Sequence, residues 1–287
     1  MKKIITILIT IFFTNIAFSQ DIYTLSVDIK YDSIVSLDGE FFAVKENGKW
    51  GVVKNRKQVL PTQFDGIDAL GDGVISFVLN NKIGFADTLG NILLEATYPI
   101  EKQSYREDFS QINVFDYGAA LVEVDGRYQL IDKQNKQIIA QEYEITSRIG
   151  DAVAIKKNGK YGIANSKGKI LLYPQYLDIS ILIEGKLYAY KQISTSGLPM
   201  FGLINGKGEK ISEAIYADFG IYNGKQATYL KAYTQEGGQA LLDDEGKIII
   251  PPIYQVILPT ILPQYFAITQ NLEEGIIGKD SVIYVPP

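Results

Sequence analysis

The chain has no cysteine and no histidine among its 287 residues, and only one tryptophan and two methionines. Without cysteine it can form neither a disulfide framework nor a thiolate metal site, and it has no cysteine nucleophile. Without histidine it lacks the most common general base and metal ligand, which excludes a Ser-His-Asp triad and a histidine zinc site. We therefore expect no catalytic residues, no metal and no cofactor.

Positive charge is also scarce. The 28 Lys and Arg residues are outnumbered by 33 Asp and Glu residues, so the formal net charge is -5 and the pI is near 5.0. A protein that follows nucleic-acid phosphates needs a basic surface, so nucleic acid is not an expected partner. What the chain has in abundance is glycine, with 26 residues, and tyrosine, with 19.

An export signal is predicted over residues 1–19. Lys2–Lys3 precedes the apolar stretch Ile4–Phe13, and Ala17–Ser19 places small residues before a cleavage site at Gln20. The apolar stretch is shorter than the roughly 20 residues that cross a bilayer. We therefore expect the remaining protein to reach the periplasm, cell envelope or extracellular space without spanning a membrane.

One short motif recurs along the rest of the chain. Its clearest copy is GKWGVV at residues 48–53, and further copies lie at 81–86, 126–131, 159–164, 199–204, 237–242 and 273–277. A polar turn former follows most copies: Asp87, Asp132, Asn165, Asn205 and Asp243. An aromatic residue then follows in phase: Phe64, Tyr98, Tyr143, Tyr176, Tyr216 and Tyr254, with an extra one upstream at Tyr31. The motif, the turn former and the aromatic residue recur together with similar spacing, which indicates a structural repeat.

The repeat predicts β-strands and no helix. Asn47–Gly48, Asp125–Gly126 and Asn158–Gly159 are typical of type I′ turns between two antiparallel strands. A third strand follows the Asp/Asn turn, and we expect prolines such as Pro61 and Pro174 to end it. A fourth strand follows the aromatic residue. The prediction is an all-β protein of about seven four-stranded units.

Two architectures use such units: a closed seven-bladed β-propeller and an open β-solenoid. The chain begins with an aromatic segment at Tyr31 that has no hairpin before it, and it ends with a hairpin near 266–284 that has no aromatic segment after it. The Tyr31 segment could therefore complete the last blade, which favours the propeller. We expect a single domain over residues 20–287 and a monomer.

These motifs resemble the WG-repeat (KWG) proteins of bacteria. The resemblance rests on GKWGVV at 48–53, the turn residues Asp132 and Asn165, KGKI at 167–170, and Pro251 with Tyr254. It covers roughly residues 31–284. The resemblance implies a repeat β scaffold that mediates interactions, and it implies no catalytic residues.

Most residues with chemical potential have structural explanations. The repeated glycines, such as Gly51 and Gly162, are expected to let one blade pack closely on the next. The in-phase aromatic residues are expected to fill the gaps between blades. The densest carboxylate cluster is Asp243–Glu245, but Asp243 is the turn former of its repeat.

Insertions between repeats are the more informative segments, because they form loops that often bind partners. One lies at residues 101–117, and its aromatic and arginine side chains are typical of binding hot spots. The candidate partner-binding residues are Tyr105, Arg106, Phe109, Phe115 and Tyr117. A second insertion at residues 192–199 lengthens a hairpin.

The function predicted from the sequence is an exported, non-enzymatic repeat scaffold. It would bind a protein or a cell-envelope polysaccharide through loops on one face. The alternative is a propeller that binds or cleaves carbohydrate with aromatic and carboxylate residues near a central channel, since a glycoside hydrolase needs two suitably spaced carboxylates.

Overall fold

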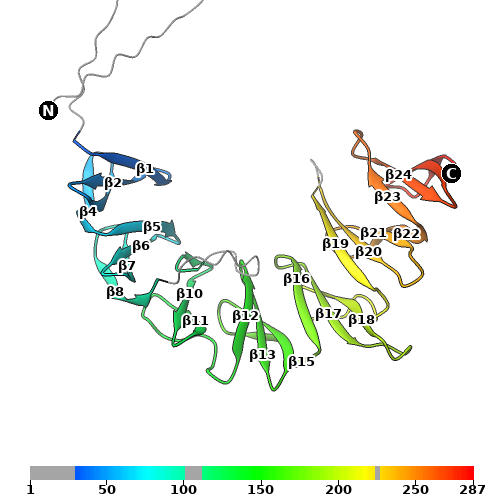
Figure 1. Ribbon diagram of the computed structural model, residues 1–287, viewed down its shortest axis with the longest axis horizontal. Coiled ribbons are helices and arrows are strands. Elements are labelled where there is room, and N and C mark those ends of the chain that lie inside the picture. Colours follow the sequence, from blue (N-terminus) through cyan, green and yellow to red (C-terminus); the bar gives the residue numbers. More distant parts are fainter. Residues whose placement is uncertain (1–29, 101–111, 224–226) are drawn as a thin grey trace, which may run out of the picture. The chain divides into compact units, whose positions relative to one another are not determined.

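The computed structural model describes residues 30–100, 112–223 and 227–287. These residues contain no helix and form 26 strands in seven antiparallel sheets (Figure 1). The all-β repeat prediction is therefore confirmed. The chain divides into two compact units, and the boundary in the sequence falls between Thr97 and Tyr98. The predicted signal peptide, residues 1–19, lies outside the described residues.

The first unit contains two four-stranded meanders. Their strands are β1 (Ser33–Asp38), β2 (Phe41–Glu46), β3 (Lys49–Lys54) and β4 (Lys57–Phe64), followed by β5 (Gly66–Gly71), β6 (Val74–Leu79), β7 (Lys82–Asp87) and β8 (Ile92–Pro99). Within each sheet the strands lie in sequence order, and each pairs with its neighbour.

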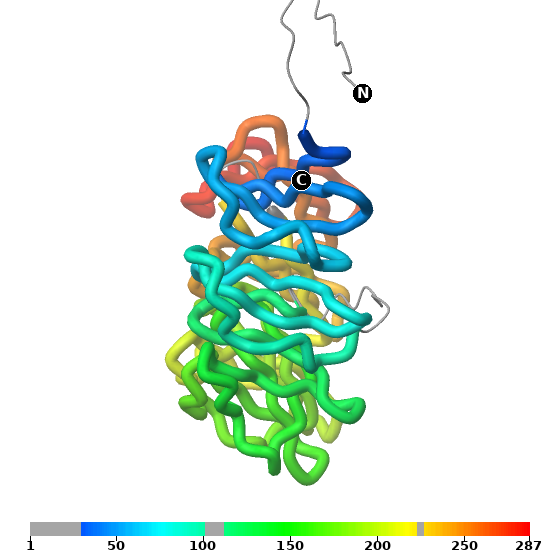
Figure 2. Tube along the Cα trace, turned by 90° about the vertical axis from the view of Figure 1, so that its left-hand side faces the viewer, coloured from blue at the N-terminus to red at the C-terminus, as the bar shows by residue number. Residues whose placement is uncertain are grey.

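The second unit contains five sheets with the same meander order. Figure 2 draws the chain as a tube coloured along the sequence from blue to red. The sheets are β9 (Phe115–Asp116), β10 (Ala119–Val124) and β11 (Arg127–Ile131); β12 (Glu144–Ile149), β13 (Ala152–Lys157), β14 (Lys160–Asn165) and β15 (Ile170–Tyr176); β16 (Asp178–Ile183), β17 (Leu187–Ile193) and β18 (Pro199–Asn205); β19 (Asp218–Asn223), β20 (Thr228–Tyr233), β21 (Gln239–Leu242) and β22 (Ile248–Tyr254); and β23 (Val256–Pro259), β24 (Tyr265–Gln270), β25 (Glu273–Gly278) and β26 (Ile283–Val285). In the two three-stranded sheets, isolated bridges such as Ile131–Gln137 and Phe201–Tyr216 stand in place of the fourth strand.

The hairpin turns have the conformation that their sequence predicts. Asn47 and Gly48 join β2 to β3 with φ values of 52° and 80°, and Asn158 and Gly159 join β13 to β14 with 51° and 73°. Two consecutive residues with positive φ define the type I′ turn, which suits the twist of paired strands. This prediction is confirmed.

The grouping of strands into sheets differs from the expectation. The strand that follows each aromatic residue is the first strand of the next sheet, not the last strand of the sheet before it. For example, β1 after Tyr31 pairs with β2, and β16 after Tyr176 pairs with β17. The first sheet is therefore complete with its own four strands, as is the last sheet, β23–β26. The expectation that the Tyr31 segment completes the last blade is wrong. The strand after Tyr31, β1, forms its hydrogen bonds with β2 of the following hairpin.

The prolines do not end the third strand of the motif. Pro61 lies inside β4 and Pro174 inside β15. Tyr161 pairs with Tyr176 and Ile163 with Leu172, so one residue of β14 lies opposite three residues of β15. Proline is tolerated in this bulge of an outer strand because no ladder hydrogen bond is needed there.

The hydrophobic core of each unit lies between consecutive sheets. In the first unit, Leu60 and Phe64 of β4 pack on Ile75 and Phe77 of β6, and the rings of Phe64 and Phe77 are 4.4 Å apart. In the second unit, four clusters fill the spaces between consecutive sheets in the same way. The prediction that the aromatic residues of the repeat pack between sheets is confirmed for those that are buried, such as Phe64 and Tyr176.

The repeated glycines make their close contacts within a sheet, not between sheets as expected. A Cβ atom on Gly51 would lie 2.5 Å from the carbonyl oxygen of Leu60, and one on Gly162 would lie 2.3 Å from that of Leu172. Both carbonyls belong to the bulged outer strand of the same sheet. Glycine is needed because the bulge folds over the neighbouring strand.

Candidate functional site: the turn edge of the second unit

The turns of each meander lie at the two opposite ends of its strands, and we refer to these two ends as edges. In an antiparallel meander, the turn between the first and second strands lies at the same edge as the turn between the third and fourth. Ser166, between β14 and β15, donates its backbone N–H to Asp151 Oδ1, between β12 and β13, over 3.0 Å. We call this edge of the sheets in the second unit the turn edge.

The turn formers make these turns rigid. Each of the five accepts hydrogen bonds from the backbone N–H groups two and four residues later, over 2.8–3.1 Å: Asp87, Asp132, Asn165, Asn205 and Asp243. The residue three positions later has a positive φ, for example 80° at Gly168. The turn prediction is confirmed, and the turn edge is a preorganised surface.

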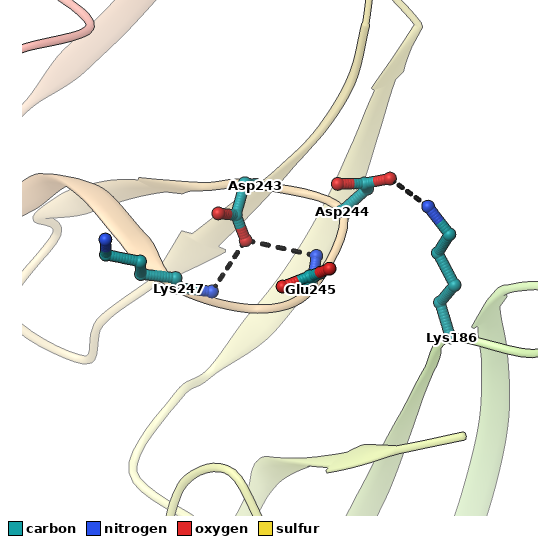
Figure 3. Close-up of polar contacts among 5 residues, drawn as sticks. All are labelled: Lys186, Asp243, Asp244, Glu245 and Lys247. Atoms are coloured by element: carbon teal, nitrogen blue, oxygen red, sulfur yellow. Dashed lines mark hydrogen bonds and ion pairs between the residues drawn. The ribbon is translucent and has the colours of Figure 1, made fainter. Parts of the chain in front are cut away.

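The densest carboxylate cluster is occupied by structural contacts (Figure 3). Asp243 Oδ1 accepts hydrogen bonds from Glu245 N at 3.0 Å and Lys247 N at 2.8 Å. Asp244 forms an ion pair with Lys186 of the neighbouring sheet, and the hydrogen bond from Lys186 lowers the pKa of Asp244. In the described ranges, no group of three or more His, Cys, Asp or Glu side chains could hold a metal ion.

We expect Asp243→Ala to lower the free energy of unfolding by about 1 kcal/mol, because two backbone N–H groups lose their acceptor. Asp244→Ala is the matched control. It removes only an exposed ion pair, so its effect should stay below about 0.5 kcal/mol. Urea unfolding followed by circular dichroism measures both. Equal losses in the two variants would contradict the assigned role of Asp243.

Arg148 is a buried charge behind the turn edge, and only 2% of the residue is exposed. Its guanidinium donates to the carbonyl oxygens of Asp116 at 2.7 Å and Gly150 at 3.1 Å, and to Ser166 Oγ at 3.4 Å. It thereby ties the end of β9 to the neighbouring sheet. Sequence reasoning missed this residue, because no other repeat has an arginine at that position. An arginine inside a strand was the available signal.

An exposed aromatic residue and two carboxylates meet at the turn edge. Tyr117, between β9 and β10, is 49% exposed and has a φ of 50°. A hydrogen bond with Glu184 and the charges of Glu184, Asp116 and Asp151 raise the pKa of Tyr117. Glu184, between β16 and β17, also accepts from Asp151 N over 3.4 Å. An aromatic ring among carboxylates is suited to contact a cationic side chain.

Of the predicted partner-binding residues, the structure describes two. Tyr105, Arg106 and Phe109 lie outside the described residues. Phe115 lies in β9 opposite Ala120 and is 1% exposed, so its side chain belongs to the core and is unavailable to a partner. The expectation for Phe115 is corrected, because strand alternation turns it inward. Tyr117 is at the surface.

The second insertion lengthens the β17–β18 hairpin, as expected. Ser194 N donates to Leu198 O at 2.8 Å and Gly197 N to Ser194 O at 3.0 Å, which closes the loop. Ile193 and Leu198 are 56% and 47% exposed. This loop lies at the edge opposite the turn edge, because it joins the second and third strands.

Comparisons with solved structures give only weak likenesses. A eukaryotic initiation factor has 11% identity and a TM-score of 0.38, over 88% of this chain and 75% of that one. PorZ, described as a surface component of the type-IX secretion system of Porphyromonas gingivalis, has 11% identity and a TM-score of 0.31, over 90% of this chain and 38% of that one. Kluyveromyces lactis Hsv2 has 8% identity and a TM-score of 0.34, over 84% and 87%. At these scores the likenesses carry no argument.

Comparison with protein families is more informative. No curated protein matches the chain. A family model described as "WG containing repeat" matches residues 24–50, 161–192 and 241–260. Each segment includes strands of the meander and part of the repeated motif. These matches confirm the resemblance found in the sequence at three segments of the chain, each of which is similar to the WG-containing repeat.

Proposed function

We propose that the protein is an exported, non-enzymatic repeat scaffold that binds a protein or cell-envelope polymer through the turn edge. The observation that carries the proposal is the group of Tyr117, Asp151 and Glu184, which three different sheets contribute. Turns held by side-chain hydrogen bonds lose little entropy on binding. The carboxylates around Tyr117 favour a partner segment with lysine or arginine side chains.

The non-enzymatic part of the proposal rests on how the acidic residues are used. Asp243 holds its turn and Asp244 pairs with Lys186. The in-phase aromatic residues Tyr176, Tyr216 and Tyr254 are at most 7% exposed. Such rings cannot stack on a sugar, so these aromatic marks give no support to the carbohydrate alternative.

The binding proposal is tested in the organism that produces the protein. Tagged protein is recovered from the cell envelope, and co-purified material is compared between the unaltered chain, Tyr117→Ala and Glu184→Gln. Both variants should lose most of the partner, because they remove the exposed ring or a neighbouring charge. Tyr173→Ala is the matched control, since Tyr173 is 70% exposed on the outer strand β15. Equal recovery from all variants would show that the turn edge does not bind.

Export is tested separately by cell fractionation and N-terminal sequencing. We expect the protein outside the cytoplasm with Gln20 at its N-terminus. A cytoplasmic protein that retains Lys2–Lys3 would contradict the export proposal. No helix in the described part of the chain is long and apolar enough to cross a membrane.

A further inference from the structure

A charged residue occupies a position of the repeat that is usually alanine. The residue after the repeated glycine pairs with the middle of the preceding strand, and its partner is an alanine in four sheets: Ala43, Ala154, Ala189 and Ala267. In the sheet of β19–β22, Leu241 holds the same place, and it pairs with Lys231 of β20. A long cationic side chain therefore replaces the small residue in this sheet.

Lys231 lies on the side of its sheet that packs against the last sheet, β23–β26. Tyr229 lies two residues before Lys231 in β20, so both side chains leave the strand on the same face. Tyr229 and Leu241 belong to one core cluster with residues of the last sheet such as Phe266. The ammonium group of Lys231 is therefore attached to a face that is otherwise part of the core.

The charge of Lys231 is not balanced by a neighbouring carboxylate. Burial lowers the pKa of Lys231. Among the residues that the structure describes, no Asp or Glu forms an ion pair with it. A charge that is taken out of water without a partner costs free energy. An anion at this place would offset that cost.

The hydroxyl group of Tyr229 is a second polar group without a partner between these two sheets. Tyr229 is 5% exposed, and its Oη forms no hydrogen bond within the described part of the chain. Its ring is held by three neighbours: the Tyr222 ring at 6.3 Å, the Phe266 ring at 5.5 Å and Lys279 Nζ at 5.0 Å. A buried hydroxyl group without a hydrogen bond is unfavourable, so this group also favours a ligand.

The edge strand has no side chain beside Lys231. Gly220 of β19 pairs with Lys231. The nearest atoms to a Cβ at Gly220 would belong to the Tyr233 side chain, from 3.3 Å. In addition, β19 is the first strand of its sheet and pairs with β20 alone. Lys231 is therefore not covered by β19 on the side that faces the edge of the sheet.

We propose that Lys231 and the hydroxyl group of Tyr229 bind a small organic carboxylate between the last two sheets. Both groups donate hydrogen bonds, and an ionised carboxylate only accepts them. One partly buried ammonium balances one negative charge, which favours a monocarboxylate over a phosphate dianion. The rings of Tyr222 and Tyr229 supply apolar contacts for the rest of the ligand. This site is distinct from the turn-edge group around Tyr117 and does not depend on the partner proposed for it.

Amine labelling of the unaltered chain tests the site directly. Lysines are modified with a limiting amount of a succinimidyl ester, with and without sodium benzoate at constant ionic strength, and mass spectrometry gives the rate at each lysine. Bound benzoate should slow the labelling of Lys231, by about tenfold for each unit that its pKa rises, because only the free amine reacts. Lys191 is the control, since it lies in the second strand of the preceding sheet, with Nζ 4.9 Å from the centre of the Phe201 ring. An unchanged rate at Lys231, or equal slowing at both lysines, would overturn the proposal.

A second measurement with variants identifies the groups that bind. At about five times its dissociation constant, benzoate should raise the melting temperature of the unaltered chain by about 2–4 °C, because it binds the folded state. The same concentration of sodium chloride should not. The rise should disappear in Lys231→Met, shrink in Tyr229→Phe and persist in Lys191→Met. A rise that persists in Lys231→Met, or an equal rise with inorganic phosphate, would overturn the assignment of a carboxylate site at Lys231.

Discussion

Replacing Gly162 with alanine should lower the free energy of unfolding by about 3 kcal/mol, at the upper end of the usual range for overpacking. The added Cβ would lie 2.3 Å from the carbonyl oxygen of Leu172 and 2.8 Å from the nitrogen of Pro174. Both atoms are backbone, so the bulge of β15 must move as a whole. Chemical denaturation of Gly162→Ala against the unaltered chain measures the loss.

Gly66→Ala is the control for this effect. A Cβ on Gly66 of β5 would meet only Val78, at an ordinary 3.5 Å, and Gly66 has no positive φ. Since alanine also restricts the unfolded chain, this variant should be neutral or more stable by up to about 1 kcal/mol. A Gly162→Ala protein as stable as Gly66→Ala would contradict the assigned role of the repeated glycine.

Raising the pH from 10 to 12 should destabilise the protein strongly, because buried tyrosines must ionise. Burial, with the charge of Glu213 and the neighbouring Tyr176, raises the pKa of Tyr190 from 10.0 to about 12. The folded state holds this proton more tightly than the unfolded state. The stability that Tyr190 contributes is therefore complete below pH 10 and is lost as the pH rises through 12, by about 2 kcal/mol from this residue at pH 12.

Burial also raises the pKa of Tyr176, Tyr188 and Tyr216, which adds to the alkaline loss. The transition is followed by phenolate absorbance together with circular dichroism. Tyr190→Phe should lose about 1 kcal/mol at neutral pH, because the hydroxyl no longer donates to Ser212 O over 2.9 Å. Its further loss between pH 10 and 12 should be smaller than that of the unaltered chain. An identical alkaline loss in both proteins would contradict the account.

The strands and turns of this fold can be predicted from the sequence because they depend on local preferences. Asn47–Gly48 adopts a type I′ turn because of its own φ and ψ freedom, and Asp243 holds its turn with groups two and four residues away. The positions of Phe64 and Tyr176 between sheets can also be predicted, because the place of a residue in the repeat determines which face of the sheet it occupies.

The grouping of strands could not be predicted in this way, because a strand between two hairpins can pair with either. The position of Tyr31 in phase does not decide whether β1 joins the hairpin that follows it or the last hairpin of the chain. The bulge at Pro174 was missed for a related reason. Proline signals a missing donor, but only the pairing of β14 with β15 shows that no donor is needed there.

The candidate site depends on contacts between turns far apart in sequence. Tyr117 and Glu184 belong to different sheets, and nothing in the local sequence of either predicts their hydrogen bond. Phe115, two residues from Tyr117, was grouped with it because both are aromatic. The end of β9 at Asp116 separates them: Phe115 lies in the strand and is buried, whereas Tyr117 lies in the following turn with a φ of 50° and is exposed.

The proposed binding role of the turn edge is tested most directly by site-specific photo-crosslinking in the producing cells. A photoreactive phenylalanine analogue replaces Tyr117 in one variant and Tyr173 in the other. We predict a discrete adduct from position 117 that is lost when Glu184→Gln is added, and no such adduct from position 173. A chain that gives no adduct at 117, or the same adducts from both positions, would contradict the claim that this protein is a scaffold that binds through its turn edge.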